Sequence, residues 1–418
     1  MFIGIVADDL TGAADSVAPF AQRGYAAGVG LSVASGVQGT DREWDALALN
    51  TELRDQESLK PTLIVSIARR ATRRLIQRAP QLYFKKIDST LRGHLRPELD
   101  GMLRELPGRL ALICPASPAN GRSVRNGVLQ VQGIPLAETE FVRGAAEPEK
   151  FATVRTAFGM ADDPMAAEID LALLREGCAA VTGELDRQLA AGARVVFCDA
   201  ETPEDLCTLA QVTLLRPERY LPVGSAGLTR AIAELRPPAV ASDSPAWDTE
   251  PFTRGRVLVV IGSLHPISRQ QARRMVGRVG VKPIILQQED RWTTRAEIRS
   301  FQESFLAPEM ISILITPEER NPQEKHYPIV NLFKMIRSRA GNPDGVPSFD
   351  GYVVTGGHTA QQVCLNMNGV ELQIFGESEP GIVRAILSRS LDLPSVPIIL
   401  KAGGFGDEGT LARCVGLE

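Results

Sequence analysis

The chain has 418 residues, of which 44% are hydrophobic, 23% are charged and only 5% are aromatic. This composition excludes a disordered or collagen-like chain, and the length favours two domains over one. The formal net charge of −4 gives no overall basic footprint, so we expect neither nucleic acid nor an anionic membrane surface as a partner.

The six cysteines are scattered, with no Cys-x-x-Cys pair, which argues against a disulfide framework and against a zinc site. We therefore predict no resident metal. The amino terminus lacks the basic and apolar regions of a signal peptide. No segment approaches the roughly 18 consecutive apolar residues of a transmembrane helix. Together these features predict a cytoplasmic protein with no membrane contact. They are compatible with a homo-oligomer.

Short β-rich runs alternate with segments of helical period along the first half of the chain. This pattern is typical of a mainly parallel sheet flanked by helices, an α/β fold. A helix that covers the sheet is predicted from Leu63 to Arg78, because its apolar residues form one stripe. We predict strands at Phe2 to Val6, Ala46 to Asn50, Leu82 to Ile87, Leu110 to Cys114 and Arg194 to Cys198.

Two polar clusters directly follow predicted strands of this half. The sequence ADDLTGAAD places Asp8 and Asp9 at the end of the first strand, before a helix that we expect to begin near Ala13. One of the two carboxylates could simply cap that helix, but two exceed what a cap needs. The sequence KKIDSTLRGH offers both cations and a carboxylate, among them Lys86 and Asp88, to a polyhydroxylated anion.

Two further strand ends are also polar. The sequence LNTELRD places Arg54 where its guanidinium could bind a carboxylate, although a surface ion pair with a neighbouring acid is the ordinary alternative. The sequence CPASPANGRSVRNG brings Asn120 and Arg122 into a loop that is too polar to be core. The four clusters together predict a binding site for a small acidic sugar.

Residues 236–256 are rich in Pro, Ser and Asp and have no sustained apolar period, so we predict an interdomain linker there. It separates a first domain, residues 1–235, from a second, residues 257–418. After the linker, short β-rich runs again alternate with segments of helical period. Strands are predicted at Val257 to Ile261, Pro283 to Leu286, Met310 to Ile315, Tyr352 to Thr355, Leu372 to Phe375 and Pro397 to Lys401.

Three glycine-containing turns directly follow strands of the second domain. Glycine lets backbone N–H groups approach an anion closely, and a following helix N-terminus adds favourable partial charge. Lys401, which ends a strand, could place its ammonium against phosphate or only extend to solvent. No Walker motif is present, so any nucleotide binds without one. The turns contain Gly262 and Ser263; Gly356, Gly357, His358 and Thr359; and Gly403 and Gly404.

The ordered set ADDLTGAAD, KKIDSTLRGH, PASPANGRSVRNGV, TGGHTA and LKAGGFG resembles the four-carbon acid sugar kinase family, once catalogued as a domain of unknown function. The resemblance runs from Ile3 to Leu411, with the linker where that family separates its sugar-binding and nucleotide-binding domains. It implies two α/β domains with the active site in the interdomain cleft. It also implies that ATP, with Mg²⁺, phosphorylates the terminal C4 hydroxyl of a tetronate such as threonate, erythronate or 3-oxo-tetronate.

The resemblance also implies roles for particular residues. Asp9 is our first choice for the catalytic base and Asp88 the alternative. Position 358 is a histidine where family members often carry an acidic residue. Position 53 is a leucine where they often carry a small polar residue. The predicted substrate contacts are Asp9, Arg54, Lys86, Ile87, Asp88 and Ser89, to which the polar loop adds Asn120 and Arg122. The predicted nucleotide contacts are Ser263, Gly356, Gly357, His358, Thr359 and Gly403, to which the strand-end pattern adds Lys401 and Gly404.

Two other classes of function compete with a kinase. A non-catalytic sensor could bind a sugar acid between two α/β lobes, but it would need no phosphate-binding turns. An aldolase or epimerase could use the glycine turns to hold a substrate that is already phosphorylated. Release of ADP in the presence of tetronates would separate the three hypotheses.

Overall fold

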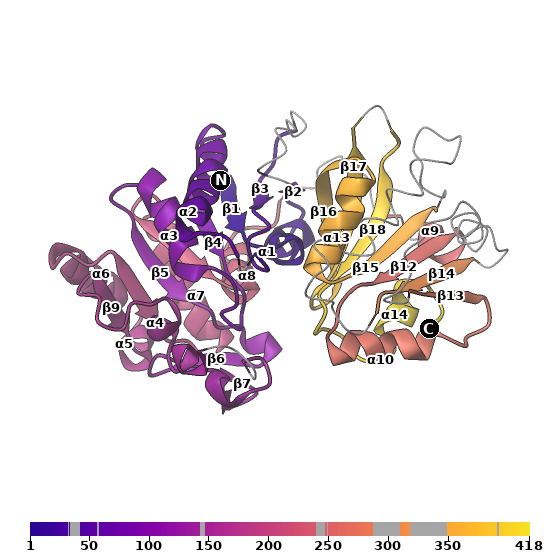
Figure 1. Cartoon of the computed structure of the whole chain (residues 1–418). Helices are drawn as coiled ribbons and strands as arrows, with labels where there is room; N and C mark the ends of the chain where they lie inside the picture. Colours follow the sequence, from indigo (N-terminus) through magenta and orange to yellow (C-terminus); the bar gives the residue numbers. More distant parts are fainter. Residues whose placement is uncertain are drawn as a thin grey trace. The chain divides into compact units, whose positions relative to one another are not determined.

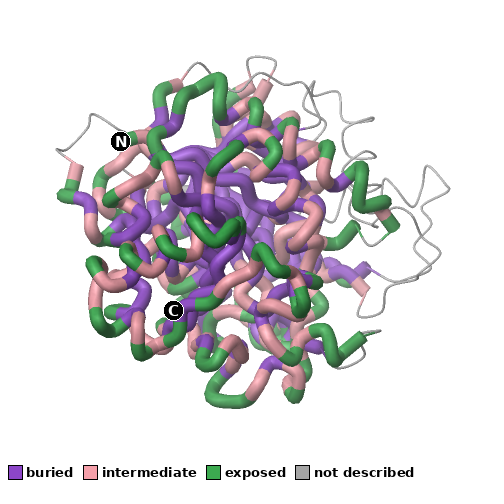
Figure 2. Tube along the Cα trace, turned by 90° about the vertical axis from the view of Figure 1, so that its left-hand side faces the viewer, coloured by how far each residue is buried: buried purple, intermediate pink, exposed green. Residues whose placement is uncertain are grey.

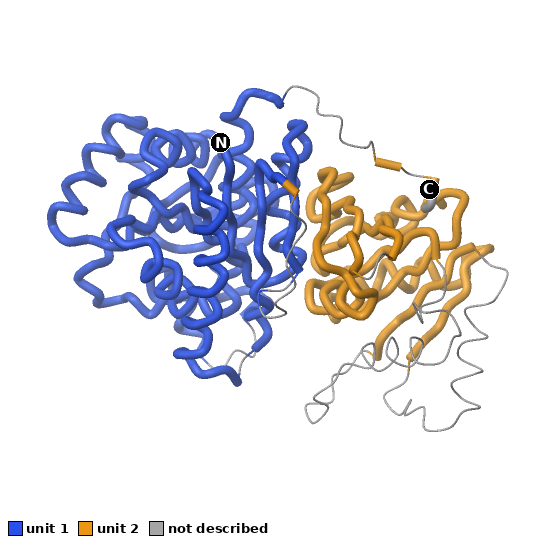
Figure 3. Tube along the Cα trace, turned by 90° about the horizontal axis from the view of Figure 1, so that it is seen from above, with its two compact units in different colours: residues 1–36, 43–242 blue, residues 37–42, 243–418 orange. Residues whose placement is uncertain are grey.

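The computed structural model describes residues 1–31, 33, 42–56, 58–142, 147–239, 247–248, 250–286, 310–317, 349–390 and 393–418. The chain divides into two compact units (Figure 3). Unit 1 comprises Met1–Gly36 and Glu43–Ser242, and unit 2 comprises Val37–Arg42 and Asp243–Glu418. Both have the α/β architecture that the sequence predicts.

The sheet of unit 1 consists of parallel strands whose side chains are almost all buried (Figures 1 and 2). Burial on both faces explains why these strands read as continuous apolar runs rather than as an alternating pattern. In spatial order the strands are β2 (Ala27–Gly30), β3 (Ala46–Asn50), β1 (Ile3–Ala7), β4 (Leu82–Lys86), β11 (Tyr220–Gly224), β5 (Leu110–Cys114), β10 (Val195–Cys198) and β9 (Ala166–Ile169).

Strand β1 lies in the interior of this sheet, with β3 on one side and β4 on the other. The chain leaves β1 toward β2 and leaves β3 toward β4, so right-handed crossovers place the intervening helices on opposite faces. The helices are α1 (Leu10–Gln22), α2 (Pro61–Ile76), α3 (Leu95–Glu105), α4 (Val154–Ala157), α5 (Leu171–Arg175), α6 (Cys178–Ala190), α7 (Pro203–Leu215) and α8 (Ala226–Glu234). A small antiparallel sheet adds β6 (Arg122–Arg125), β7 (Val128–Val131) and β8 (Ile134–Pro135).

Unit 2 has a mainly parallel sheet in which β17 runs antiparallel to both of its neighbours, β18 and β16. Its spatial order is β13 (Val281–Ile285), β14 (Ile311–Ile315), β12 (Val257–Ile261), β15 (Gly351–Thr355), β18 (Val396–Lys401), β17 (Ile382–Arg389) and β16 (Gly369–Glu379). The described helices are α9 (Glu250–Thr253), α10 (Pro266–Met275), α13 (Gly357–Asn366) and α14 (Thr410–Cys414). None of the described helices is long and apolar enough to cross a membrane.

The structure corrects two local predictions. Helix α1 begins at Leu10, earlier than expected, because the Asp9 carboxylate caps it by accepting the Gly12 N–H at 2.9 Å. Part of the predicted linker forms helix α9, whose Phe252 packs into the core of unit 2 and stacks on Trp247, with 5.5 Å between ring centroids. Residues 240–246 and 249 of that linker lie outside the described residues.

Candidate functional site

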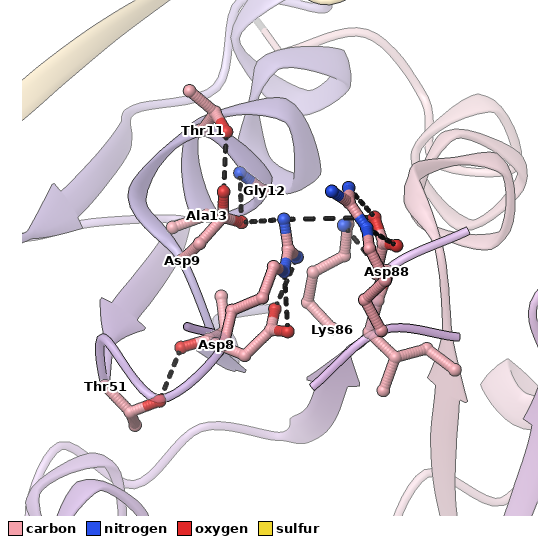
Figure 4. A network of polar contacts seen from close by, with 12 residues as sticks. Asp8, Asp9, Thr11, Gly12, Ala13, Thr51, Lys86 and Asp88 are labelled. Atoms are coloured by element: carbon pink, nitrogen blue, oxygen red, sulfur yellow. Dashed lines mark hydrogen bonds and ion pairs between the residues drawn. The ribbon is translucent and has the colours of Figure 1, made fainter. Parts of the chain in front are cut away.

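Three neighbouring strands of unit 1 end in register, with Ala7 opposite both Asn50 and Lys86. Because parallel strands share one carboxyl edge, the residues that follow them meet there. Strand β1 is followed by Asp8 and Asp9, β3 by the segment that carries Arg54, and β4 by Asp88. The sequence clusters therefore form one site, which Figure 4 shows from close by.

Arg54 is the centre of this site. Its Nε and Nη2 donate to the two carboxylate oxygens of Asp8 at 2.9 and 2.6 Å, and its Nη1 lies 2.9 Å from Asp9 Oδ1 and 3.8 Å from Asp88 Oδ1. Burial alone would lower the pKa of the guanidinium, but the three carboxylates raise that pKa well above its ordinary value. Arg54 therefore does pair with a neighbouring acid, but the expected surface ion pair is wrong about its place, because both side chains are buried.

Asp8 and Asp88 are both fixed as carboxylates. Burial would raise the pKa of each, but the nearby cations outweigh burial and lower it. For Asp88 these are Arg92 and Arg54, and its Oδ2 also accepts from Arg92 Nε at 2.7 Å and from Thr90 Oγ1 at 2.5 Å. The pKa of Asp88 is therefore held well below the ordinary value for an aspartate.

This lowered pKa gives a stability prediction for acid. A group whose folded-state pKa is depressed stabilises the fold above its unfolded-state pKa, and this contribution disappears as the pH falls through the folded-state pKa. We expect the melting temperature of the wild type to fall more steeply below about pH 4 than that of Asp88→Asn. Thermal melts from pH 6 to pH 2 measure this difference. Parallel curves for the two proteins would show that the Asp88 carboxylate is not preferentially ionised in the folded state.

Asp9 differs from its two neighbours. Its side chain is 13% exposed, against 3% for Asp8 and 11% for Asp88. Its Oδ1 accepts the Gly12 N–H and pairs with the Arg54 guanidinium, whereas its Oδ2 has, within the described part of the chain, the Thr11 hydroxyl as its one donor, at 2.7 Å. Asp9 therefore combines the role of a helix cap with one carboxylate oxygen that has room for another proton donor.

Lys86 lies beside Asp9 and Arg54. Its Nζ donates to Ile87 O at 3.0 Å, and a Cβ placed on Gly12 would overlap Asp9 Oδ1 and lie 3.1 Å from Lys86 Nζ. Glycine at this position thus leaves space for a carboxylate and an ammonium at the start of α1. The buried Ile87 and the half-buried Ser89 complete the turn, as the sequence predicts.

A buried ion pair, missed in the sequence, lies behind this cluster. Lys85 Nζ donates to Glu98 Oε2 at 2.9 Å and to Lys86 O at 2.9 Å, and both side chains are buried. The charges of Lys85 and Lys86 also help to keep Asp8 ionised. One signal was available, because Glu98 falls on the apolar face of α3 with Leu95 and Met102.

The polar loop after β5 brings Arg122 toward the same edge. Burial is the main cause that lowers the pKa of Arg122. The charge of Asp88 raises this pKa and the charge of Arg92 lowers it, so the Arg122 guanidinium interacts electrostatically with the Asp88–Arg92 ion pair. Its Nη1 donates to Asn120 O, and Asn120 Nδ2 donates to Ser117 Oγ at 2.9 Å. Among the described residues, the buried Arg122 Nε has no hydrogen-bond partner and no carboxylate forms an ion pair with Arg122.

The three glycine turns of unit 2 meet around Ser263. A Cβ on Gly356, whose φ is +90°, would lie 3.5 Å from Ser263, and one on Gly403 would overlap the Ser263 hydroxyl. A Cβ on Gly262 would likewise overlap Thr359 Oγ1, and one on Gly404 would lie 3.1 Å from His265 Nε2. The close approaches explain glycine at 262 and 403, and the positive φ explains it at 356. The same contacts bring together the turns that contain Ser263, Gly356, Gly357, His358, Thr359, Gly403 and Gly404.

Lys401 is completely buried and does not extend to solvent. Burial lowers its pKa to about 8. Its Nζ donates to Ala402 O at 3.1 Å, and it lies 3.3 Å from both Gly403 O and Ser268 Oγ. Lys401 therefore contacts the glycine turn through the carbonyl groups of Ala402 and Gly403.

Comparisons with known proteins match each half of the chain to a domain family. A family profile described as a sugar-binding N-terminal domain matches residues 3–232, and one described as a nucleotide-binding C-terminal domain matches residues 258–411. A solved structure from Salmonella typhimurium has a TM-score of 0.78, with 23% identity over 98% of each chain. A solved Haemophilus influenzae protein of family DUF1537 has a TM-score of 0.72, with 20% identity over 99% of each chain. These two structures share the fold.

Curated relatives match nearly the whole chain. The D-threonate kinase of Bordetella bronchiseptica is 30% identical over 99% of this chain and 96% of its own length. The 3-oxo-tetronate kinase of Brucella melitensis is 26% identical over 98% of this chain and 94% of its own length. Since the two domain profiles occur in the order that the motifs predict and these relatives align almost end to end, the chain belongs to the four-carbon acid sugar kinase family.

Proposed function

We propose that this protein is an ATP-dependent kinase that phosphorylates the terminal C4 hydroxyl of a four-carbon sugar acid such as threonate, erythronate or 3-oxo-tetronate. The observation that carries the proposal is the end-to-end likeness to a D-threonate kinase, in a chain that matches both a sugar-binding and a nucleotide-binding domain. A D-erythronate kinase of Heliobacterium modesticaldum, 32% identical over 64% of this chain, also supports it. The two domain matches do not favour a sensor or an aldolase.

The test is an ADP-release assay with ATP and a panel of D-threonate, D-erythronate and 3-oxo-tetronate. ADP that forms only with a sugar acid, together with a phosphorylated product, supports the kinase. Binding of a tetronate without turnover would favour the sensor, and conversion of a phosphorylated sugar acid without ATP would favour the aldolase or epimerase. The sugar acid with the largest kcat/KM identifies the substrate.

We place the sugar acid on the edge of unit 1 that contains Asp9, Lys86 and Asp88, and the nucleotide on the glycine turns of unit 2. Phosphoryl transfer through a loose transition state needs mainly positioning and neutralisation of charge. Asp9 would accept the proton of the attacking hydroxyl, and the γ-phosphoryl group would pass directly to that oxygen as ADP leaves. Trapping of a ³²P-labelled enzyme would refute direct transfer.

Mg²⁺ is part of this proposal as the partner of the ATP phosphates. It is usually bound through one or two carboxylates and several phosphate oxygens rather than by an all-protein site. Among the described residues, no group of three or more His, Cys, Asp or Glu side chains is arranged to hold a metal ion. When bound, Mg²⁺ would supply neutralisation of the charge on the transferred group.

Arg122 is our candidate for binding the substrate carboxylate. The guanidinium of Arg54 is already surrounded by three carboxylates, whereas Arg122 has a buried Nε with no partner among the described residues. A bidentate contact with a carboxylate would satisfy such a group.

We therefore expect Arg122→Gln to raise the KM for the sugar acid about tenfold or more, because it removes a charge-assisted contact of about 1.5–3 kcal/mol. The KM for ATP should stay near the wild-type value in steady-state kinetics. Arg125→Gln is the matched control, since Arg125 lies on the same strand but is exposed and pairs with Glu201 at 3.5 Å. Equal effects of the two substitutions would remove Arg122 from the substrate site.

A further inference from the structure

The turn of residues 402–407 is held against helix α10 by its carbonyl groups. Ser268 Oγ donates to Gly403 O at 2.7 Å. Gln271 Nε2 donates to Phe405 O at 3.2 Å and to Asp407 O at 2.6 Å. Lys401 Nζ adds its bonds to the first two carbonyls of the turn. Four carbonyl groups of this short segment thus face inward.

The inward carbonyls determine where the amide groups point. In a trans peptide, the N–H of a residue points opposite to the carbonyl of the residue before it, and the described chain contains no cis peptide bond. The N–H groups of Gly403, Gly404 and Gly406 therefore point away from the side chains that hold the turn. Among the described residues, none of these three N–H groups has a hydrogen-bond acceptor. Successive backbone N–H groups, such as those of Gly403 and Gly404, can form an anion-binding concavity, to which the N–H of Gly406 would add a third donor.

Gln271 is the residue best placed to maintain this arrangement. It is completely buried, and the hydrogens of its amide nitrogen face two carbonyl oxygens, which can only accept. Its Oε1 is buried and has no hydrogen-bond partner among the described residues. Within the described part of the chain, both hydrogen bonds of the Gln271 side chain thus go to the turn.

A positive charge reinforces the same geometry. The ammonium of Lys401 is completely buried, and none of the described carboxylates pairs with it. Its charge lies behind the turn while the free N–H groups point to the other side. An anion in front of the turn would therefore be attracted by both the amide dipoles and the ammonium.

We propose that Gln271, assisted by Ser268, is a positioning residue of the nucleotide site: it holds the carbonyls of residues 402–407 against α10, so that the N–H groups of Gly403, Gly404 and Gly406 bind the phosphates of ATP. The inference rests on the proposed kinase function, because it assigns the anion to the nucleotide. Gln271 itself touches no phosphate in this arrangement. Replacing Gln271 should therefore weaken the binding of ligands that carry the phosphate groups and leave the binding of the nucleoside alone unchanged.

The experiment compares Gln271→Met with the wild type by calorimetric titration of the full chain. Methionine fills similar space but donates no hydrogen bond. We expect the Kd for a non-hydrolysable ATP analogue and for inorganic tripolyphosphate to rise about tenfold or more, since two hydrogen bonds that shape the turn are lost. The Kd for adenosine and that for the sugar acid should change less than twofold.

Gln270→Met is the matched control, because the neighbouring Gln270 is exposed and its side chain donates to the Glu408 side chain rather than to the turn. It should leave all four Kd values near those of the wild type. If Gln271→Met does not fold, Ser268→Ala supplies a second test. The Kd for the ATP analogue and that for tripolyphosphate should rise, whereas the Kd for adenosine should not.

Two outcomes would overturn the proposal. The first is a well-folded Gln271→Met variant that binds tripolyphosphate as tightly as the wild type. The second is an equal loss of affinity for adenosine, which would indicate general disruption of unit 2. The kinase proposal fails separately, if the wild type binds the ATP analogue but transfers no phosphate to any sugar acid.

Discussion

Replacing Asp9 with asparagine is expected to lower kcat by about a hundredfold or more, which is within the range for loss of a general base. The KM for ATP should remain near its wild-type value. The reason lies in the three carboxylates around Arg54. Asp8 and Asp88 have pKa values lowered by their cationic neighbours, and both oxygens of each accept from cationic side chains. Asp9 is the most exposed of the three and keeps Oδ2 with one hydroxyl donor.

The asparagine variant isolates this charge because Asn and Asp cap helices about equally well. The bond from the Gly12 N–H to the side chain at position 9 can therefore persist, and the melting temperature should change little. Asp170→Asn is the matched control, since Asp170 caps helix α5 by accepting the Leu173 N–H at 2.9 Å and lies outside the cluster. It should leave kcat unchanged. Turnover of Asp9→Asn close to that of the wild type would transfer the role of base to Asp88 or remove the need for one.

Replacing Arg54 with alanine is expected to lower the free energy of unfolding by about 3–5 kcal/mol, the range for breaking a buried ion pair from one side. The substitution leaves Asp8, Asp9 and Asp88 close together without their shared counterion. The KM for the sugar acid should also rise at least about tenfold, because Asp9 loses the group that fixes its position. Urea unfolding and steady-state kinetics measure the two effects.

Arg54→Lys should recover part of the stability but little of the activity, because an ammonium restores the charge without the planar fork that binds Asp8 with two bonds. Arg73→Ala is a suitable control: Arg73 pairs with Glu105 at 2.8 Å, but its side chain is largely exposed, so the loss of stability should be much smaller than for Arg54→Ala. If Arg54→Ala proves no more costly than this control, the three carboxylates do not depend on Arg54 for their charge.

The structure extends the sequence-based prediction of the fold in identifiable places. Strands with long apolar runs, such as β5 and β12, were predicted with their exact bounds because local hydrophobicity alone marks them. Strand β11 was missed, since its Pro222 argues against a central strand. The structure accommodates this proline because β11 pairs with β4 only at Val223 and Gly224, beyond it.

The small sheet of β6, β7 and β8 was missed for another reason. Its strands are short and only partly buried, so they carry no continuous apolar signal. Long-range contacts hold its first turn: Asp199, at the end of β10, accepts the N–H groups of Asn126 and Gly127 at 2.7 and 2.9 Å. A pairing over more than 70 residues leaves no local pattern in either segment.

The polar clusters after the strands of unit 1 and the glycine turns after those of unit 2 could be predicted from the sequence, because these features are local to the chain. The order of the motifs also predicted the family. Which charges neutralise one another depends on the tertiary structure. Asp8 and Arg54 are 46 positions apart, and Gln271 is 134 and 136 positions from the two carbonyls that it holds. Such partners are chosen by the register of the strands and the packing of the helices, and these depend on the whole fold rather than on any one segment.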